Sequence, residues 1–391
     1  MMDASLFIAG KLHVKSRIAM ICIAVSFLVM IIAVSVSSGF RNEIRKGVSS
    51  IAGDVLISTS DLNFLSETVP IEADASYLEA VSDLECVREI VPTVWRAGIV
   101  RQDDGMHGVV IKGRPAGAVS DSVSLAVSIP RSLSRASGLK EGDRMMTWFV
   151  GENMNVRQFT VASVHDDMVE ADGSYLVYAS LEDMQRLNGW EDNQVSALEV
   201  YLADGYESDA QINEATGEIG TLINAYLTDE EEYVIATSSV SRYPQLFSWL
   251  DLIDFNVFFI LLLMTIVAGF NMISGLLIIL FEHISMIGLL KSLGMKDKAI
   301  AKVFLSASAV ITLKAMAIGN AIAILFCVLQ DTTHMLKLDP ENYYVSFVPV
   351  NVDFVRIFAA DVVSFVVIML LLLIPCLFIS KVDPAETVRV R

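Results

Sequence analysis

Four long apolar runs constrain the fold of this 391-residue chain more than any other feature of its sequence. The second run extends from Phe255 to Phe281 and contains no charged residue. The hydrocarbon core of a bilayer is about 30 Å thick, and a helix needs about 20 apolar residues to cross it. This run exceeds that length, so the sequence predicts a membrane protein.

The four runs divide the chain into nine segments. The first run is longer than the apolar part of a cleaved signal peptide and has no compact small-x-small cleavage site, so it is interpreted as a transmembrane helix. The predicted segments are a cytoplasmic head at 1–17, transmembrane helices at 18–38, 251–281, 303–329 and 357–379, an extracytoplasmic domain at 39–250, a connector at 282–302, an extracytoplasmic loop at 330–356 and a cytoplasmic tail at 380–391.

The composition agrees with this division. The chain is 54% hydrophobic, yet its formal charge is −18. Apolar spans at the ends and an acidic soluble domain between them account for both values. The acidity argues against nucleic-acid binding, which needs a basic surface.

Cysteine and histidine usage gives no sign of a disulfide or a metal site. Cys86 alone lies outside the apolar runs, so the domain cannot form an internal disulfide. The five histidines are scattered without the spacing of metal ligands. The domain is therefore expected to fold on its own hydrophobic core.

The segment 39–250 shows the patterns of a mixed α/β domain. Alternating or β-branched stretches predict strands at 53–58, 93–100, 108–113, 157–164, 174–180 and 196–202. Amphipathic stretches predict helices at 77–87, 181–188 and 208–226. The residues 102–105 predict a hairpin turn. The fold class is thus four membrane helices with a large α/β extracytoplasmic domain between the first and the second.

The distribution of basic residues sets the expected orientation. Lysine and arginine occur three times in the head, four times in the connector and three times in the tail, whereas the loop 330–354 contains only Lys337. The positive-inside rule then places both termini in the cytoplasm. Arg41, Arg45 and Lys46 follow the first span and run against the rule, but long translocated domains largely escape it.

Polar residues inside the predicted spans invite separate interpretations. An ammonium in a span is costly, so Lys314 is expected to face a wet bundle interior, with a relay role as the alternative. Asn271 and Asn320 suit interhelical hydrogen bonds, and Ala315 with Gly319 has the small-xxx-small spacing of close helix contacts. Asp361 lies too near the outer end of its span to pair easily with Lys314.

The sequence shows no active site. It contains no G-x-x-x-x-G-K-[ST] phosphate loop, no G-x-S-x-G and no H-E-x-x-H. The chain is therefore not expected to be an enzyme or to hydrolyse ATP by the phosphate-loop route.

The connector 282–302 is the most informative stretch. Ile284, Ile287, Leu290 and Leu293 recur near helical spacing, and Gly294 offers a stop. An amphipathic helix resting on the membrane explains this pattern. A lever that inserts into a cytoplasmic motor protein explains it equally.

The connector carries a family resemblance. Glu282 followed by IGLLKSLGMKDKAI (287–300) resembles the coupling-helix segment of FtsX/MacB-type ABC transporter permeases, and one span, a large domain and three further spans is similar to their architecture. Within that superfamily the chain most resembles the lipoprotein-releasing permeases of Gram-negative bacteria. The segments that resemble this subgroup are 38–58, 243–255, 267–278, 338–350 and 383–389.

The resemblance implies an inner-membrane complex of two permease chains, identical or homologous, with two copies of a separate ATPase that binds ATP and Mg. It implies a lipoprotein substrate, membrane lipid contacts and a periplasmic carrier. The resemblance implies that conformational changes of the ATPase are transmitted to this chain through the connector residues Glu282, Ile284, Ile287, Gly288, Leu290, Lys291 and Gly294. The residues expected to contact acyl chains, which would enter between the first and second spans, are Met30, Val34, Phe40, Phe258 and Leu262.

One departure from the subgroup leaves alternatives open. The carrier-binding member has a proline-containing hairpin hook, whereas this chain has only the short GENMNVR (151–157) at that place. Either the partner permease carries the hook, carrier binding differs, or the substrate is not a lipoprotein. The rival functions are a MacB-like mechanotransmission efflux permease and a cell-division-type regulator of wall hydrolases.

Overall fold

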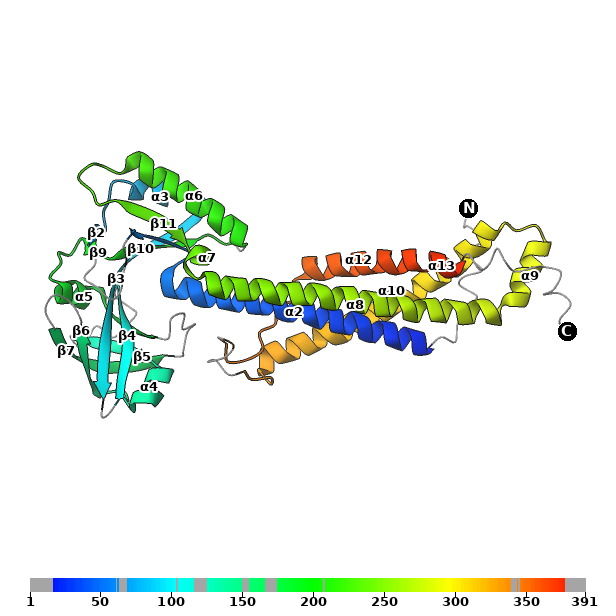
Figure 1. The fold of residues 1–391 in the computed structure, drawn as a ribbon, viewed down its shortest axis with the longest axis horizontal. Helices are drawn as coiled ribbons and strands as arrows, with labels where there is room; N and C mark the ends of the chain where they lie inside the picture. Colours follow the sequence, from blue (N-terminus) through cyan, green and yellow to red (C-terminus); the bar gives the residue numbers. More distant parts are fainter. Residues whose placement is uncertain are drawn as a thin grey trace. The chain divides into compact units, whose positions relative to one another are not determined.

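The structure is a computed structural model that describes residues 17–60, 62, 69–102, 105–115, 125–149, 155–165, 174–206, 208–338, 343 and 345–376. Most of the expected head, the tail and the start of the short hairpin at 151–157 lie outside these residues. The chain forms two compact units (Figure 1). The helical unit comprises Met1–Asn42, Leu250–Lys337 and Phe347–Arg391, and the sheet unit comprises Glu43–Trp249 and Leu338–Ser346.

Within the described ranges, four helices are long and apolar enough to cross a membrane. They are α2 (Arg17–Ala52), α8 (Pro244–Glu282), α10 (Asp297–Thr333) and α12 (Phe354–Leu371) with its short extension α13 (Leu373–Cys376). Three of these helices extend beyond the apolar runs in the sequence, because hydropathy reports contact with lipid and not where helical hydrogen bonding stops. Helices α2 and α8 each contribute residues to both units.

Small residues let the helices of the helical unit approach closely. A Cβ at Gly319 of α10 would overlap the carbonyl oxygen of Ala24 on α2, and Ala315 one turn earlier is fully buried. A Cβ at Gly269 of α8 would meet the Leu371 side chain of α12. The close contact expected from the Ala315–Gly319 spacing is thereby confirmed.

Polar side chains also join these helices. Asn320 Nδ2 of α10 donates to Asp361 Oδ2 of α12 at 2.6 Å, so the interhelical hydrogen bond expected of Asn320 is present. The hydroxyls of Thr265 and Ser364 are 3.0 Å apart between α8 and α12. Lys314, in contrast, is exposed on the outside of this chain's helices. The expectation that it faces the bundle interior is wrong for a single chain.

Arg41 links α2 to α8. Its guanidinium lies 2.6 Å from Asp251 Oδ1 and 2.8 Å from Asp254 Oδ2, and the Ser37 hydroxyl donates to the same Asp254 carboxylate. In the sheet unit Arg45 forms a similar pair with Asp209 at 3.0 Å. Two of the three basic residues that run against the positive-inside rule are therefore neutralised by carboxylates of the chain itself.

The loop between α10 and α12 lies against α2. The Asn351 backbone N–H donates to the Ser35 carbonyl at 2.9 Å. A Cβ at Gly39 would overlap the Pro349 backbone, so this glycine permits the close approach. The His334 and Phe347 rings stack with centroids 4.0 Å apart within the same loop region.

The sheet unit is built around one long strand, β3 (Val87–Gln102). Its first part closes a four-stranded sheet with the order β11 (Val234–Ser238), β1 (Val55–Thr59), β10 (Ala197–Leu202), β3. The strands β2 (Ile71–Glu72) and β9 (Gln194–Val195) form a separate two-stranded antiparallel sheet.

The second part of β3 enters a ring of six strands. The order is β3, β4 (Gly105–Arg114), β8 (Tyr175–Ser180), β5 (Ala126–Pro130), β7 (Asn155–His165) and β6 (Arg144–Phe149), and β6 pairs again with β3. Gln102 pairs with Gly105, which confirms the predicted hairpin between β3 and β4. The residues at its tip, 103–104, lie outside the described residues.

In the described part of the sheet unit, five helices accompany the strands: α3 (Leu78–Ser82), α4 (Arg131–Ser137), α5 (Leu181–Asn188), α6 (Asp209–Tyr226) and α7 (Ser239–Arg242). The predicted helix at 77–87 is wrong in its second half, because α3 ends at Ser82 and Val87 already belongs to β3. Ser208 caps α6 through a capping box with Gln211, which explains why this helix begins where the sequence placed it.

A buried ion pair holds the last turn of α2 in the sheet unit. The Lys112 ammonium and the Glu199 carboxylate are both fully buried and 2.6 Å apart. The ammonium also donates to the Ile51 carbonyl at the end of α2 and lies 4.8 Å from the Trp95 ring centre. Burial lowers the pKa of Lys112 to about 8, although Glu199 raises it. A cation at a helix C-terminus is electrostatically favourable, so the pair fixes where α2 ends.

A second carboxylate ties the connections around α3 and α6 together. Glu231 accepts hydrogen bonds of 2.7 Å from the Ser76 backbone and hydroxyl and of 2.9 Å from those of Thr228. Burial alone raises the pKa of Glu231, but these four hydrogen bonds outweigh it and lower the pKa to about 2.

The helix contact at Gly319 gives a direct prediction. Replacing Gly319 with Leu forces α10 away from α2, and overpacking of this kind costs about 1–3 kcal/mol. The midpoint of thermal unfolding in detergent should fall. The matched control is Gly220→Leu, because a Cβ at this α6 glycine meets nothing within 4 Å. Equal midpoints for the two variants would contradict the close contact.

The Glu231 clamp predicts a pH-dependent effect. Because the folded-state pKa is lowered from 4.5 to about 2, the ionised clamp stabilises the fold fully above pH 4.5 and is lost as the pH falls through about 2. Glu231→Gln should therefore be less stable than wild type at pH 7, with the difference shrinking toward pH 2. Denaturant unfolding across this range measures it, with the exposed neighbour in Glu230→Gln as control. A difference that does not change with pH would refute this account.

Candidate functional site

The connector folds as a short helix followed by a tight stop. Helix α9 (Ile284–Ser292) ends at Gly294, whose φ of +86° suits glycine. The Gly294 N–H donates to the Lys291 carbonyl at 2.9 Å, and the Met295 N–H donates to the Leu290 carbonyl at 3.0 Å. These two bonds form a Schellman motif. The stop expected at Gly294 is thereby confirmed, and α10 begins at Asp297.

One face of α9 packs against the chain's own helices. Ile287 and Gly288 are buried, and Leu290 and Met295 pack on the same hydrophobic cluster as Ile279 and Ile300. Lys291 forms an ion pair with Asp297 at 3.0 Å and is only 10% exposed. These residues hold the turn between α8 and α10 in shape, so they position the surface that a partner would meet.

The opposite face of α9 is apolar and exposed. Leu289 is 56% exposed and Leu293 is 76% exposed, and Phe281 just before the helix is 68% exposed. Glu282 and Ile284 are exposed beside them. Exposed leucines at spacing i, i+4 form one continuous stripe on a helix.

The structure therefore sorts the predicted coupling residues into two groups. Glu282, Ile284 and Gly294 are exposed, whereas Ile287, Gly288, Leu290 and Lys291 face the chain itself. The prediction that both groups couple the chain to an ATPase stays a prediction, and the second group also packs within the chain. Sequence reasoning missed Leu289, because its helical spacing was traced through Ile287 and Leu290. The same pattern shifted by one residue would have included it.

The residues expected to contact acyl chains are sorted in the same way. Met30 is 1% exposed, and Val34 and Phe40 are each 8% exposed. The Met30 sulfur lies 3.6 Å from the Thr265 hydroxyl and 3.6 Å from the Ser364 hydroxyl. These three side chains are core residues of the chain. Phe258 and Leu262 are 59% and 47% exposed on α8.

Phe258 and Leu262 belong to a larger exposed stripe. Phe255, Phe259 and Ile266 lie on the same part of α8, and the Phe255 and Phe259 rings meet edge to face with centroids 4.8 Å apart. An apolar stripe of this kind needs lipid, a second chain or an apolar ligand to cover it.

Among the described residues, no group of three or more His, Cys, Asp or Glu side chains is placed to hold a metal ion. Every long helix of the helical unit exposes apolar side chains, and those considered as candidate sites are the α9 face with Leu289 and Leu293 and the α8 stripe from Phe255 to Ile266.

Residues 258–384 match the family described as FtsX-like permease C-terminal. The chain contains an FtsX-like permease domain. This domain includes most of α8, all of α9 and α10, and α12, so the α9 turn is part of it. The resemblance inferred from the connector sequence is confirmed. Permeases of the ABC transporter family work with an ATPase partner and a permease partner.

Relatives extend the similarity beyond the FtsX-like domain. The chain is 24% identical to the lipoprotein-releasing system transmembrane protein LolC of Neisseria meningitidis serogroup B, over 97% of this chain and 95% of that protein. It is 22% identical to LolC of Xylella fastidiosa over the same shares. Among solved structures, the periplasmic region of MacB from Actinobacillus actinomycetemcomitans covers 53% of this chain and 97% of its own, with 12% identity and a TM-score of 0.33.

The exposed face of α9 is a candidate surface for an ATPase partner, and two substitutions test this assignment. Leu289→Asp combined with Leu293→Asp places two charges on that face without touching the buried side. Copurification of the ATPase should fall by roughly tenfold or more, as when central apolar contacts of an interface are lost. Thr332→Asp, on the exposed far end of α10, is the control. Retention of the ATPase by the double variant would contradict this assignment.

Proposed function

We propose that this chain is the permease subunit of an ATP-driven transporter that extracts lipoproteins from the bacterial inner membrane and passes them to a periplasmic carrier. The observation that carries the proposal is the similarity to LolC along 97% of the chain, which spans the sheet unit as well as the FtsX-like domain. A similarity confined to 258–384 would support only a permease.

The proposed complex contains two permease chains, identical or homologous, and two copies of an ATPase subunit. ATP and Mg bind to the ATPase, and this chain is a non-catalytic membrane subunit. The exposed leucines of α9 receive the motion of the ATPase, because they are the apolar groups of the α9 turn that are not used for internal packing.

The proposed topology places the head, α9 and the tail in the cytoplasm and the sheet unit in the periplasm. It is supported by the basic residues of the head, connector and tail. The internal pairing of Arg41 with Asp251 and Asp254 supports it too, since this cation does not stand alone on the outer side.

In this proposal the exposed stripe of α8 receives the acyl chains of the lipoprotein. Phe258 and Leu262 are central to the stripe and are the exposed members of the residues predicted for this role. Phenylalanine rings and leucine side chains favour contact with hydrocarbon over contact with water. Membrane lipid covers the same stripe when no lipoprotein is bound.

Copurification tests the proposal. The complex is purified in nanodiscs, and bound proteins and lipids are identified by mass spectrometry. Wild type should retain an ATPase, a permease partner and lipoproteins. The Phe258→Ala variant should retain the ATPase, but the amount of copurified lipoprotein should fall roughly tenfold. Removing a large aromatic side chain from an apolar contact costs about 1 kcal/mol or more.

The matched control is Val363→Ala, an exposed apolar residue of α12 at 62% exposure. It should behave as wild type. An ATPase found with a wall hydrolase or with an efflux partner, and no lipoprotein, would leave the permease assignment intact and overturn the substrate.

A further inference from the structure

One stretch of β3 has a strand neighbour on one side only. Residues 87–93 pair with β10, while β4 begins to pair with the other edge of β3 at Val94. The six-stranded ring closes on itself, so its strands have no such free edge along their paired residues. Among the described strands, β11 is also an edge strand, since it pairs only with β1, but the open edge of 87–93 is the one beside the cavity described next.

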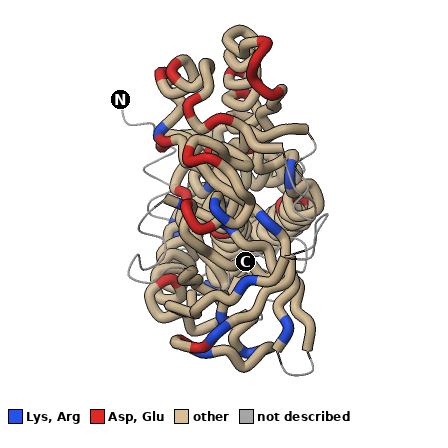
Figure 2. The backbone as a smooth tube through the Cα atoms, turned by 90° about the vertical axis from the view of Figure 1, so that its left-hand side faces the viewer, with Lys and Arg blue, Asp and Glu red and all other residues tan. Residues whose placement is uncertain are grey.

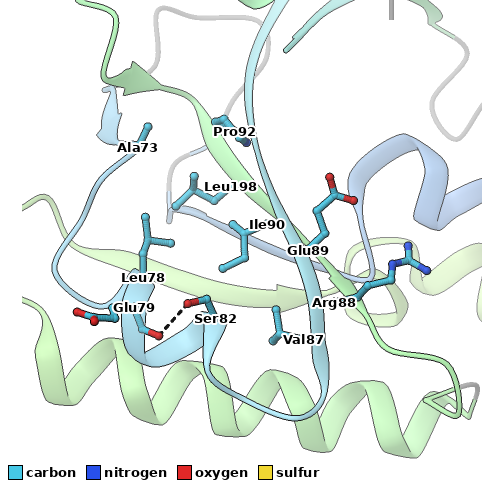
Figure 3. Close-up of a pocket in the computed structure, with 10 residues that line it drawn as sticks. All are labelled: Ala73, Leu78, Glu79, Ser82, Val87, Arg88, Glu89, Ile90, Pro92 and Leu198. Atoms are coloured by element: carbon cyan, nitrogen blue, oxygen red, sulfur yellow. Dashed lines mark hydrogen bonds between the residues drawn. The ribbon is translucent and has the colours of Figure 1, made fainter. Parts of the chain in front are cut away.

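A cavity of about 400 Å³ lies beside this edge (Figure 3). It is lined by Ala73, Leu78, Glu79, Ser82, Val87, Arg88, Glu89, Ile90, Pro92 and Leu198. Alternate residues of a strand point to opposite faces. Val87 to Ile90 nevertheless all line the cavity, because the pairing of β3 with β10 shifts register between Val87 and Glu89 and interrupts the alternation there.

The cavity is apolar inside and charged at its rim. Leu78, Ile90 and Leu198 point toward one another in Figure 3, whereas Glu79 and Glu89 point outward. Arg88 points to the same side of β3 as Glu89, and its guanidinium lies 5.9 Å from the Tyr201 ring centre. The charged residues around the cavity are therefore two glutamates and one arginine.

The surrounding part of the sheet unit is also acidic. Between Lys46 and Arg88 the sequence has eight acidic residues and no lysine or arginine, and between Arg186 and Arg242 it has twelve and none. These stretches form α3, α6, β1, β10 and β11. In Figure 2 acidic segments dominate the upper helices of this unit, and basic segments gather in its lower strands.

We propose that the open edge of β3 and the cavity beside it form a docking site for an extended, basic segment of a partner protein. The segment adds as a strand to residues 87–91, about 17 Å long, and places an apolar side chain in the cavity. Pro92 has no N–H and ends the pairing. The acidic residues of the surrounding stretches 47–87 and 187–241 favour basic over acidic segments. The proposal does not depend on what the transporter moves.

The test uses the full chain in nanodiscs and an end-blocked, fluorescent Lys-Val-Lys-Val-Lys-Val peptide followed by anisotropy. The peptide should bind in a salt-sensitive manner. A version with N-methyl groups on alternate backbone nitrogens cannot complete the strand pairing and should bind roughly tenfold more weakly or worse. The matched Glu-Val peptide should not bind.

Two variants locate the site. Ser82→Trp places a large ring at the mouth of the cavity and should abolish binding. Thr221→Trp is the control, because both hydroxyls are exposed helix groups that only bond a carbonyl of their own helix. Circular dichroism checks that both variants fold.

Three results would overturn the proposal. The first is that the Lys-Val peptide does not bind. The second is that N-methylation leaves its affinity unchanged, which excludes strand addition. The third concerns charge and place: equal binding of the Glu-Val peptide would exclude charge selection, and equal binding by the Ser82→Trp and Thr221→Trp variants would exclude this cavity.

Discussion

The contact of the Lys112 ammonium with the Ile51 carbonyl and the Glu199 carboxylate is the constraint on which the sheet unit depends. An unpaired charge in that position would be strongly destabilising, so each of the three groups requires the other two. Through them, the last turn of an apolar helix is fastened to β4 and β10 at the middle of the sheet. A helix that would otherwise fray at its C-terminus thus ends at a defined residue.

In the helical unit, the candidate contact surfaces are apolar side chains that helix–helix packing leaves exposed. The inner faces of the helices pack against one another through the close contacts at Gly319 and Gly269 and the hydrogen bond between Asn320 and Asp361. The α8 stripe and the leucines of α9 are among the apolar side chains that remain exposed. The two surfaces proposed to meet substrate and ATPase are therefore ones that the chain does not use for its internal packing.

Much of this arrangement follows from the sequence, and its limits have physical causes. Apolar runs, the Gly294 stop and the Ala315–Gly319 spacing each depend on local chemistry, so they were predictable. The identity of the exposed leucines on α9 was not, because Ile287 and Leu289 have the same hydrophobicity and differ only in which neighbour they meet. The second half of β3 could be recognised as a strand, but its first half follows α3 so closely that the sequence pattern merges with the helix. Met30 and Phe258 likewise differ only in tertiary packing.

The exposed position of Lys314 has a consequence for how the protein is made. Among the 18-residue apolar stretches of the four helices, that of α10 has the lowest mean hydropathy, at 2.0. An ammonium at the centre of a membrane helix adds about 2.5–3.5 kcal/mol to the cost of insertion. The tight turn at Gly294 keeps α8, with a mean hydropathy of 2.3, directly next to α10 in the growing chain. The two helices are therefore suited to enter the bilayer together as a hairpin during synthesis, with the more apolar helix assisting the less apolar one.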